Sequence, residues 1–219
     1  MSTITLVRHG QANTAAQDED SYDNLSDLGR QQAAWLGDHL DDTHEHFERV
    51  YCGTLRRHRQ TATQMRAQAR ADIQQDARLN EMEFFTLANL LRDQQGIAMP
   101  QSREQFVTYM PMLLSKWQAG EIETPPETFQ QFETRVNEAL IDIAAGRGPA
   151  LVVTSGGLIG MAFRQAMGLD ITAFSRTCIA IMNTSVHRLH PIGDRLSMTQ
   201  FNATPHLDRP DRQFAQTHL

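Results

Sequence analysis

The chain opens with the stretch Ile4-Thr5-Leu6-Val7-Arg8-His9-Gly10-Gln11, an apolar, β-branched run that stops abruptly at polar residues and a glycine. Such a run is typical of a buried strand that ends in a tight loop. In open α/β sheets, ligands bind beyond the carboxyl ends of the strands. A guanidinium and an imidazole at that point favour an anionic ligand and a nucleophile or base. A strand end that carries Arg8 and His9 by chance fits this stretch equally well.

Length and charge limit the classes of protein that the sequence can represent. Its 219 residues suit one domain, or one domain with an insertion, and hydrophobic residues make up 40%, enough for a sizeable core. The formal net charge is −6, from 20 Lys plus Arg against 26 Asp plus Glu. Because a nonspecific nucleic-acid binder usually carries a basic face, the composition argues against a nucleic-acid partner.

The small number of cysteines and the lack of long apolar segments both favour a cytoplasmic location. Cys52 and Cys178 are too few for a disulfide scaffold or a zinc site of regular spacing, which predicts two reduced thiols and no metal or cofactor. No segment approaches the roughly 18 apolar residues of a membrane span. The N-terminus lacks the charged region and apolar region of a signal peptide. We therefore expect a cytoplasmic protein without a membrane partner.

Periodicity and turn signals predict an alternation of helices and short strands along the chain. Ser26 is a candidate N-cap for a first helix and Thr54 for a second. A fully apolar strand at 150–154 is followed by the small residues Ser155-Gly156-Gly157. The other predicted elements are strands at 48–52 and 72–76, helices at about 55–69 and 158–167, and extended edge strands at 180–182, 185–190 and 195–201.

Residues 84–146 carry no strand pattern and are predicted to be helical, with breaks near 96–100 and 120–126. The last of these helices, at about 127–145, places Phe129, Phe132 and Val136 at helical spacing. Aromatic stripes of this kind belong to a core more often than to a cofactor site. We expect a helical insertion over about 84–126 that covers the end of the sheet, within a single domain of residues 1–219.

Taken together and in order, these motifs resemble those of the histidine phosphatase superfamily, which contains the cofactor-dependent phosphoglycerate mutases and many small phosphomonoesterases. The resemblance covers most of the chain. It rests on Leu6-Val7-Arg8-His9-Gly10-Gln11, Leu25-Ser26-x-x-Gly29-x-x-Gln32-Ala33, Val50-Tyr51-Cys52-Gly53-x-Leu55-x-Arg57-x-x-x-Thr61-Ala62, Leu79-x-Glu81, the strand Leu151-Val152-Val153-Thr154 and Asn183-x-Ser185-Val186. It implies a three-layer α/β/α fold with a mostly parallel central sheet.

The resemblance also implies roles for individual residues. His9 matches the nucleophile that takes the phosphoryl group as a phosphohistidine, and a neutral imidazole can attack phosphorus without first losing a proton. Arg8 and Arg57 match the cations that hold the phosphoryl group. Glu81 matches the acid that protonates the leaving oxygen and then activates water, although Glu83 lies close enough to leave that assignment open. For Arg57, an exposed helix face flanked by other arginines is the alternative.

The sequence departs from the superfamily where the late strand ends. The family places a second, phosphate-binding histidine there, in a Thr-His-Gly pattern, whereas this chain has Thr154 followed by Ser155 and Gly156. Ser155 keeps a hydroxyl donor at a helix N-terminus but supplies no cation, and an N-cap role is the simpler alternative. If the group was merely lost, Ser155→His should raise the transfer rate. We count Ser155, Gly156 and Asn13 with Arg8 and Arg57 as phosphate-binding residues.

The other histidines offer no obvious replacement for the missing one. A surface position is predicted for His39, His44, His46, His187 and His190. A second departure follows Glu81, where Phe84-Phe85-Thr86-Leu87 replaces the family's usual aromatic-glycine pattern, so the loop that would face the substrate is not that of a typical mutase.

The function that these features favour is a metal-independent phosphatase that acts on a small phosphomonoester through His9. Two alternatives remain from the sequence: a phospho-ligand binding or regulatory protein with little catalysis, and a phosphotransferase of the mutase type. The expected partner is a small phosphorylated substrate. The identity of that substrate and the oligomeric state do not follow from the sequence.

Overall fold

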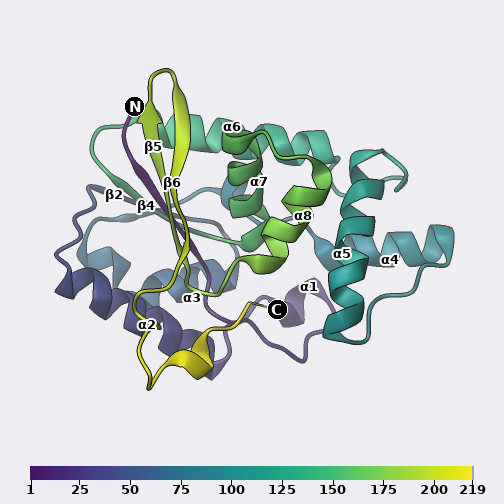
Figure 1. The fold of residues 1–219 in the computed structure, drawn as a ribbon, viewed down its shortest axis with the longest axis horizontal. Coiled ribbons are helices and arrows are strands. Elements are labelled where there is room, and N and C mark those ends of the chain that lie inside the picture. The colour runs from purple at the N-terminus through teal and green to yellow at the C-terminus, as the bar shows by residue number, and fades with distance from the viewer. Residues whose placement is uncertain (219) are drawn as a thin grey trace.

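The structure is a computed structural model that describes residues 1–218, and its centre is a mixed β-sheet (Figure 1). The strands of this sheet are β1 (Ile4–Arg8), β2 (Arg49–Cys52), β3 (Ile73–Gln75), β4 (Ala150–Thr154), β5 (Val186–Ile192) and β6 (Arg195–Ala203). Their spatial order is β3-β2-β4-β1-β5-β6. Strands β1 to β4 are parallel, whereas β5 pairs antiparallel with β1 and β6 antiparallel with β5. The sheet is therefore mostly parallel, as predicted.

Helices cover both faces of this sheet and one of its ends (Figure 1). They are α1 (Glu19–Tyr22), α2 (Asp27–Asp42), α3 (Arg56–Gln64), α4 (Phe84–Gln95), α5 (Arg103–Gln118), α6 (Phe129–Ala145), α7 (Gly156–Met167) and α8 (Ile171–Ala180). Helices α2 and α3 pack on one face and α6, α7 and α8 on the other, while α4 and α5 lie beyond one end. This arrangement confirms the predicted three-layer α/β/α fold class.

The two central strands divide their side chains between two cores. In β1, Ile4 and Leu6 face the core under α6 and α7, and Val7 faces the core under α2 and α3. In β4, Val152 belongs to the first core and Leu151 to the second. This follows from the period of two in a strand, which sends successive side chains to opposite faces. Both strands are buried throughout because both faces are covered.

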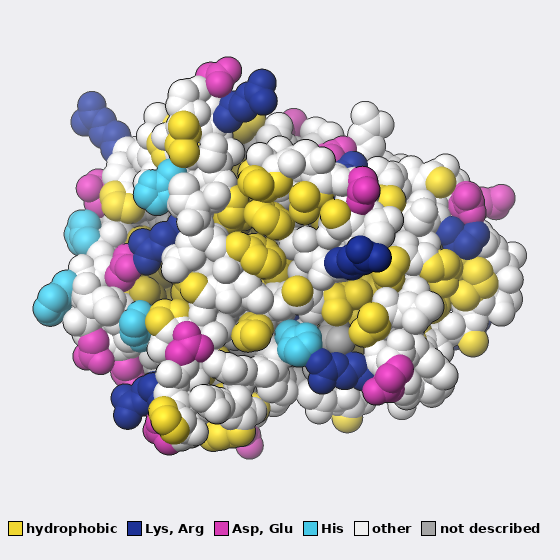
Figure 2. Space-filling view, viewed as in Figure 1, with side chains coloured by type: hydrophobic (Ala, Val, Ile, Leu, Met, Phe, Trp, Pro, Cys, Tyr) yellow, Lys and Arg dark blue, Asp and Glu magenta, His cyan; other side chains and the backbone are white. Residues whose placement is uncertain are grey.

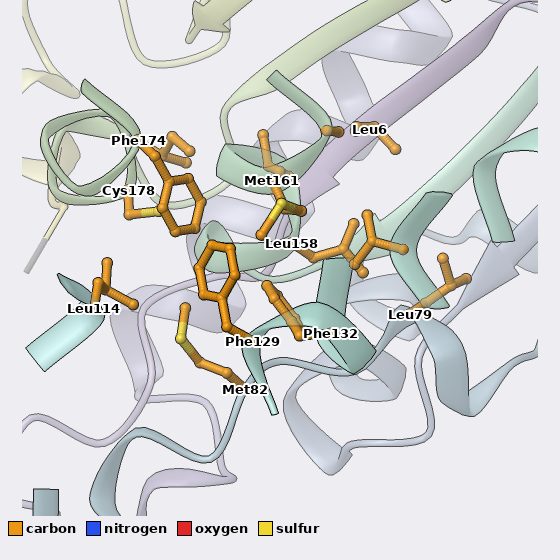
Figure 3. Packing of buried hydrophobic residues seen from close by; sticks show 14 of the residues in the cluster. Leu6, Leu79, Met82, Leu114, Phe129, Phe132, Leu158, Met161, Phe174 and Cys178 are labelled. Atoms are coloured by element: carbon orange, nitrogen blue, oxygen red, sulfur yellow. The ribbon is translucent and has the colours of Figure 1, made fainter. Parts of the chain in front are cut away.

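The larger core lies between the sheet and α6, α7 and α8. Phe129 and Phe132 from α6, Leu158 and Met161 from α7, and Phe174 from α8 converge there (Figure 3). The rings of Phe129 and Phe174 meet edge to face with centroids 6.0 Å apart, a geometry that aromatic pairs favour. Each large apolar side chain that is fully buried stabilises the fold by roughly 1.5–3 kcal/mol. The aromatic stripe of α6 is therefore core, as predicted.

The block without strand pattern folds into α4, α5 and α6, which are separated where breaks were predicted. Gly96 ends α4 at φ +69° and Gly120 follows α5 at φ +73°, a left-handed conformation that glycine adopts without steric penalty. Helices α4 and α5 fall within residues 84–126. That this segment is an insertion into a single domain stays a prediction.

The start of α3 differs from the sequence prediction. Leu55, not Thr54, holds the N-cap position, and its side chain cannot cap. The carboxylate of Asp23 instead accepts hydrogen bonds from the backbone N–H groups of Arg56 and Arg57, at 2.8 and 3.1 Å. A carboxylate in this position satisfies unpaired donors and complements the helix dipole. The cap therefore comes from a distant loop, which local sequence signals could not reveal.

Two further elements differ from the prediction. Helix α3 ends before residue 65, not near 69, because Arg66 adopts a left-handed φ of 54°. The segment 180–182, predicted as an edge strand, is not extended: Ala180 is the last residue of α8, and residues 181–182 follow it outside any strand. Asp170 is the N-cap of that helix, and Phe174 and Cys178, four residues apart, are both buried on its inner face. Helical spacing thus outweighs the apparent alternation.

The helices in the described part of the chain are too short or too polar to cross a lipid bilayer. None of those within residues 1–218 combines the length and the apolar character that a crossing requires.

The loop after β1 and the first turn of α2 touch backbone to backbone. A Cβ on Gly29 would lie 2.1 Å from the carbonyl oxygen of Gln11, and one on Gly10 would lie 2.2 Å from the carbonyl oxygen of Gly29. Replacing a helical glycine by alanine ordinarily stabilises by about 0.5–1 kcal/mol. We expect Gly29→Ala to destabilise by about 1–3 kcal/mol instead, measured by urea denaturation. Gln31→Ala, at an exposed site of the same helix, is the control. A more stable Gly29→Ala protein would contradict this close approach.

Candidate active site

His9 lies at the carboxyl end of β1 and is almost completely buried. Its backbone N–H donates to the carbonyl of Thr154 at 2.8 Å, which ties it to the end of β4. Its side-chain Nδ1 lies 2.7 Å from the carbonyl oxygen of Gly10. A carbonyl oxygen can only accept, so Nδ1 carries the proton and donates it to this bond. The lone pair of Nε2 is then free to act as a nucleophile.

The surroundings of His9 keep its imidazole neutral. Burial lowers the pKa of His9 well below its usual value, and the positive charges of Arg57 and Arg8 lower it further, with His58 also contributing. A neutral imidazole at pH 7 retains the lone pair that nucleophilic attack requires.

Arg57 is the one arginine of the α3 start that points inward. Its side chain is 2% exposed, whereas Arg56 and Arg59 lie on the surface. Its Nη1 donates to Asp23 at 3.2 Å, and its guanidinium carbon lies 5.0 Å from the ring centroid of Tyr22. The exposed-face alternative for Arg57 is therefore wrong. The carboxylate that caps the helix also orients the cation.

Arg8 is held from a different direction. Its Nη1 donates to the carbonyl oxygens of Ile181 and, at 2.9 Å, His218. The Nε atoms of Arg8 and Arg57 are buried and find no hydrogen-bond acceptor among residues 1–218. Buried donors are nearly always paired in native proteins, so both guanidinium groups are suited to an anionic ligand.

The two candidate acids lie in different places. Glu81 lines the cavity beside the start of α7, where its carboxylate accepts from the backbone N–H of Gly157 at 2.8 Å and of Met82 at 3.1 Å. Glu83 is exposed at the N-cap of α4 and accepts from the Thr86 hydroxyl. The geometry thus favours Glu81 over Glu83, and its catalytic role stays a prediction.

Ser155 does not cap α7, although it holds the N-cap position. Its hydroxyl oxygen lies 2.6 Å from Nε2 of His58, a fully buried residue of α3. The ring of His58 lies with its centroid 5.8 Å from that of His9. Burial lowers the pKa of His58 well below its usual value, and Arg57 lowers it further. Ser155 therefore holds the N-cap position without a side-chain cap, its role as a phosphate ligand stays a prediction, and a second imidazole lies beside that of His9.

Sequence reasoning missed His58 because nothing in its immediate context marks it as buried. The only available signal was its place directly after Arg57 at the start of a helix. The surface prediction for His187 was also wrong: this residue is fully buried on β5, with Nε2 2.8 Å from the hydroxyl oxygen of Ser185. The surface prediction assumed that His187 lies on an edge strand. In the structure β5 is not an edge strand, because it lies between β1 and β6.

The remaining predicted phosphate ligands fall in two places. Gly156 lines the cavity next to Arg8, and a Cβ built on it would meet the Nε of Arg8 at 3.5 Å. Asn13 lies in a neighbouring, smaller hollow. Its amide donates to the carbonyl of Ser21 and its oxygen accepts from the N–H of Ala15, so its side chain holds its own loop together. A phosphate contact from Asn13 stays a prediction.

A cavity of about 450 Å³ opens in front of these charged groups. Arg8, Arg57, Glu81 and Gly156 form its polar end. Its walls are mostly apolar, and they come from α1, the loop after Glu81, α4, α5 and α8. The wall residues include Tyr22, Met82, Phe84, Phe85, Pro100, Phe106, Met110 and Ile179, with Glu19, Arg103 and His218 at other points. The cavity is far larger than a phosphate group alone.

His218, the last described residue, lines this cavity. Thr217 accepts from the backbone N–H of Asn183 at 2.8 Å through its carbonyl, and its hydroxyl contacts the side chains of Asn183 and Gln32. His218 follows, with its ring against Arg103 and its carbonyl on Arg8. No local sequence pattern indicates that this tail forms part of the cavity wall.

The thiols are not activated nucleophiles. Burial raises the pKa of Cys52 to about 11 and that of Cys178 well above its usual value, so both stay protonated. Both are free thiols. Within the part of the chain that the structure describes, no three His, Cys, Asp or Glu side chains come together as metal ligands would. His9 is buried and lies close enough to Arg57 and Arg8 for their charges to lower its pKa, and its role as a nucleophile stays a prediction.

Comparison with known proteins places this geometry in context. The family model described as the histidine phosphatase superfamily (branch 1) matches residues 4–204. No curated protein matches the chain. Among solved structures, a phosphoserine phosphatase from Entamoeba histolytica, a mutant in complex with phosphoserine, superposes with a TM-score of 0.70 at 18% identity, over 94% of this chain and 100% of that one.

Two other solved structures have a similar fold. A phosphoglycerate mutase from Bacillus anthracis has a TM-score of 0.69 and 21% identity, with 94% of each chain covered. A mycobacterial glucosyl-3-phosphoglycerate phosphatase, solved with vanadate, has a TM-score of 0.65 and 20% identity, over 92% of this chain and 98% of that one. At such identities these likenesses show a common fold.

The buried neutral histidines predict an acid-sensitive fold. Burial lowers the pKa of His187 and of His206 to about 3, and those of His9 and His58 also fall below the usual value. In the unfolded chain each titrates near 6.5. Between these values the unfolded state binds more protons, so stability is fully present above about pH 7 and is lost as the pH falls.

We expect the free energy of unfolding to drop below pH 6.5 by about 1.4 kcal/mol per pH unit for each such histidine. Urea denaturation at pH 7.5, 6.5 and 5.5 measures this slope. The variant His206→Ala should show a shallower slope than wild type. A free energy that stays constant over this range would mean that the histidines titrate normally in the folded protein.

Proposed function

Because the chain belongs to the histidine phosphatase superfamily, we propose that it is a phosphatase that hydrolyses a phosphomonoester through a phosphohistidine on His9. The observation that carries this proposal is the buried Nδ1 bond of His9 to the Gly10 carbonyl, which leaves the Nε2 lone pair free in a ring whose pKa the charges of Arg57 and Arg8 lower. Phosphoryl transfer depends mainly on positioning and on stabilisation of negative charge. The hydrogen bond of Nδ1 positions the ring of His9, and Arg8 and Arg57 supply positive charge that can stabilise the phosphoryl oxygens.

In the proposed reaction, Nε2 of His9 attacks phosphorus as the bond between phosphorus and the leaving oxygen breaks. Glu81 gives a proton to that oxygen and the alcohol leaves. Water then attacks the phosphohistidine, Glu81 takes its proton, and phosphate departs while His9 is regenerated. A positioned acid and base of this kind contributes roughly 10²–10⁴-fold. Arg8 and Arg57 stabilise the phosphoryl oxygens through both steps, and the reaction uses no metal or cofactor.

The test of this mechanism is the phosphoenzyme itself. Rapid acid-free quenching after mixing with a ³²P-labelled aryl phosphate should trap a phosphoprotein that is labile to acid and stable to alkali. We expect His9→Ala to remove both the phosphoprotein and turnover, with less than about 1% of activity left. The exposed variant His44→Ala is the control. Turnover that persists in His9→Ala, or a wild type that depends on added divalent metal, would contradict the proposal.

The walls of the cavity support a bulky, apolar leaving group. Tyr22, Phe84, Phe85 and Phe106 present aromatic surface beyond the polar end, and Phe84 and Phe106 pack with ring centroids 5.3 Å apart. An alcohol rich in hydroxyls would leave its polar groups unpaired against these rings. We therefore propose that the substrate is an aryl or similarly apolar phosphomonoester.

We expect kcat/KM for 1-naphthyl phosphate to exceed that for glycerol 1-phosphate. Phe106→Ala should lower kcat/KM for the naphthyl ester about tenfold, because it removes aromatic packing in the ground and transition states alike, and should change the glycerol ester little. Val107→Ala is the matched control, since Val107 neighbours Phe106 on α5 and is 45% exposed. A preference for the glycerol ester would overturn the assignment of the leaving group.

A further inference from the structure

The contact between His58 and Ser155 joins two elements that are distant in the sequence. His58 belongs to α3, and Ser155 lies between β4 and α7. Both side chains are fully buried, and the 2.6 Å distance between Nε2 and the hydroxyl oxygen is that of a short hydrogen bond. The ring of His58 is fixed on its other side by Gly53, where a Cβ would lie only 2.2 Å from Nδ1. The imidazole therefore has little freedom to turn.

The proton arrangement of this pair follows from the other ring nitrogen. Nδ1 of His58 is buried and has no hydrogen-bond partner among residues 1–218. An unpaired buried N–H is rarer in proteins than an unsatisfied acceptor. The neutral ring should therefore keep its proton on Nε2 and donate it to the Ser155 oxygen, with only a lone pair left unsatisfied at Nδ1. The hydroxyl hydrogen of Ser155 is then available to a different acceptor.

We propose that His58 is a positioning residue that directs the Ser155 hydroxyl toward the phosphoryl group bound at His9, so that the His58–Ser155 pair takes the place of a single histidine at position 155. The inference rests on the proposed function. The ring of His58 lies beside that of His9, with centroids 5.8 Å apart, and Gly156, which follows Ser155, lines the cavity with Arg8. In this proposal Ser155 donates to the phosphoryl group, and His58 acts through it.

This arrangement also explains why a histidine at position 155 would not fit. The space next to the Ser155 hydroxyl holds the ring of His58. A larger side chain at 155 would meet that ring, and overpacking of a buried site is destabilising. We therefore expect Ser155→His to lose activity on its own, and the exchange His58→Ala with Ser155→His to recover at least part of it, because the imidazole then enters the site from the other element.

A double-mutant cycle tests the pair, with kcat on an aryl phosphate and the Kd of vanadate, measured by calorimetry, as its two readouts. Ser155→Ala should lower kcat about 10²-fold, as loss of one pre-organised donor does. His58→Ala should lower it about tenfold or more, and the double variant should be no worse than Ser155→Ala alone, since both act as one unit. Vanadate binding should weaken in the same non-additive pattern.

Two further measurements separate positioning from simple packing. His58→Gln keeps an N–H donor near the position of Nε2 and should restore most of the kcat lost in His58→Ala. Nitrogen-15 NMR of labelled protein should show His58 as the neutral Nε2–H tautomer. The matched control is His206→Ala, because His206 is also buried, lies 2.8 Å from the hydroxyl oxygen of Thr184 through Nε2, and has an unpartnered Nδ1 outside the cavity. It should lower stability without the selective fall in vanadate affinity.

The outcomes distinguish this inference from the proposed function. An inert wild type that still shows the non-additive vanadate pattern would overturn the phosphatase proposal and leave the pair as an anion-binding device. An active wild type with additive losses, an Nδ1–H tautomer, or a His58→Gln protein as impaired as His58→Ala would overturn the role of His58 and leave the phosphatase proposal standing.

Discussion

The site depends on the register between β1 and β4. Ile4 aligns with Ala150 and Arg8 with Thr154, and the backbone N–H of His9 continues the ladder to the Thr154 carbonyl. Parallel strands that end at the same level bring their following loops together, which is why α/β sheets bind ligands at this edge. A shift of one residue would turn the buried side chains of both strands to the wrong face. The packing of two cores therefore fixes where the imidazole of His9 lies.

The second constraint on the site is that two arginines and two histidines are buried close to one another. Cations are costly to remove from water unless they are paired, and the protein meets this in two ways. Arg57 is paired with Asp23, which also caps α3, and Arg8 is held by main-chain carbonyls. The imidazoles of His9 and His58 stay neutral instead, since burial and the neighbouring guanidinium charges disfavour their protonation. Neutrality suits His9 to the nucleophilic role proposed for it, and it makes stability depend on pH.

The cavity illustrates how distant segments build one surface. Its polar end comes from the last residue of β1, the first turns of α3 and α7, and Glu81. Its apolar walls come chiefly from α1, α4, α5 and α8, and His218 lines another part of it. Figure 2 shows apolar side chains and charged groups side by side on the face seen in Figure 1. Only the polar end was suggested by sequence motifs, because a motif records residues that are close along the chain.

The sequence alone determined the parts of this protein that local physics controls. The apolar runs at β1 and β4, the N-cap at Ser26, the glycine-marked breaks at Gly96 and Gly120 and the stripe of α6 all follow from strand and helix periods, turn chemistry and burial. The end of β1 also carries the motif around His9, on which the resemblance to the family partly rests. Tertiary structure decided what depends on neighbours from other elements: which of three arginines in α3 turns inward, whether Glu81 or Glu83 faces the cavity, and that His58 meets Ser155. Those outcomes rest on packing and hydrogen-bond contacts between residues far apart in sequence, and no local pattern encodes such contacts.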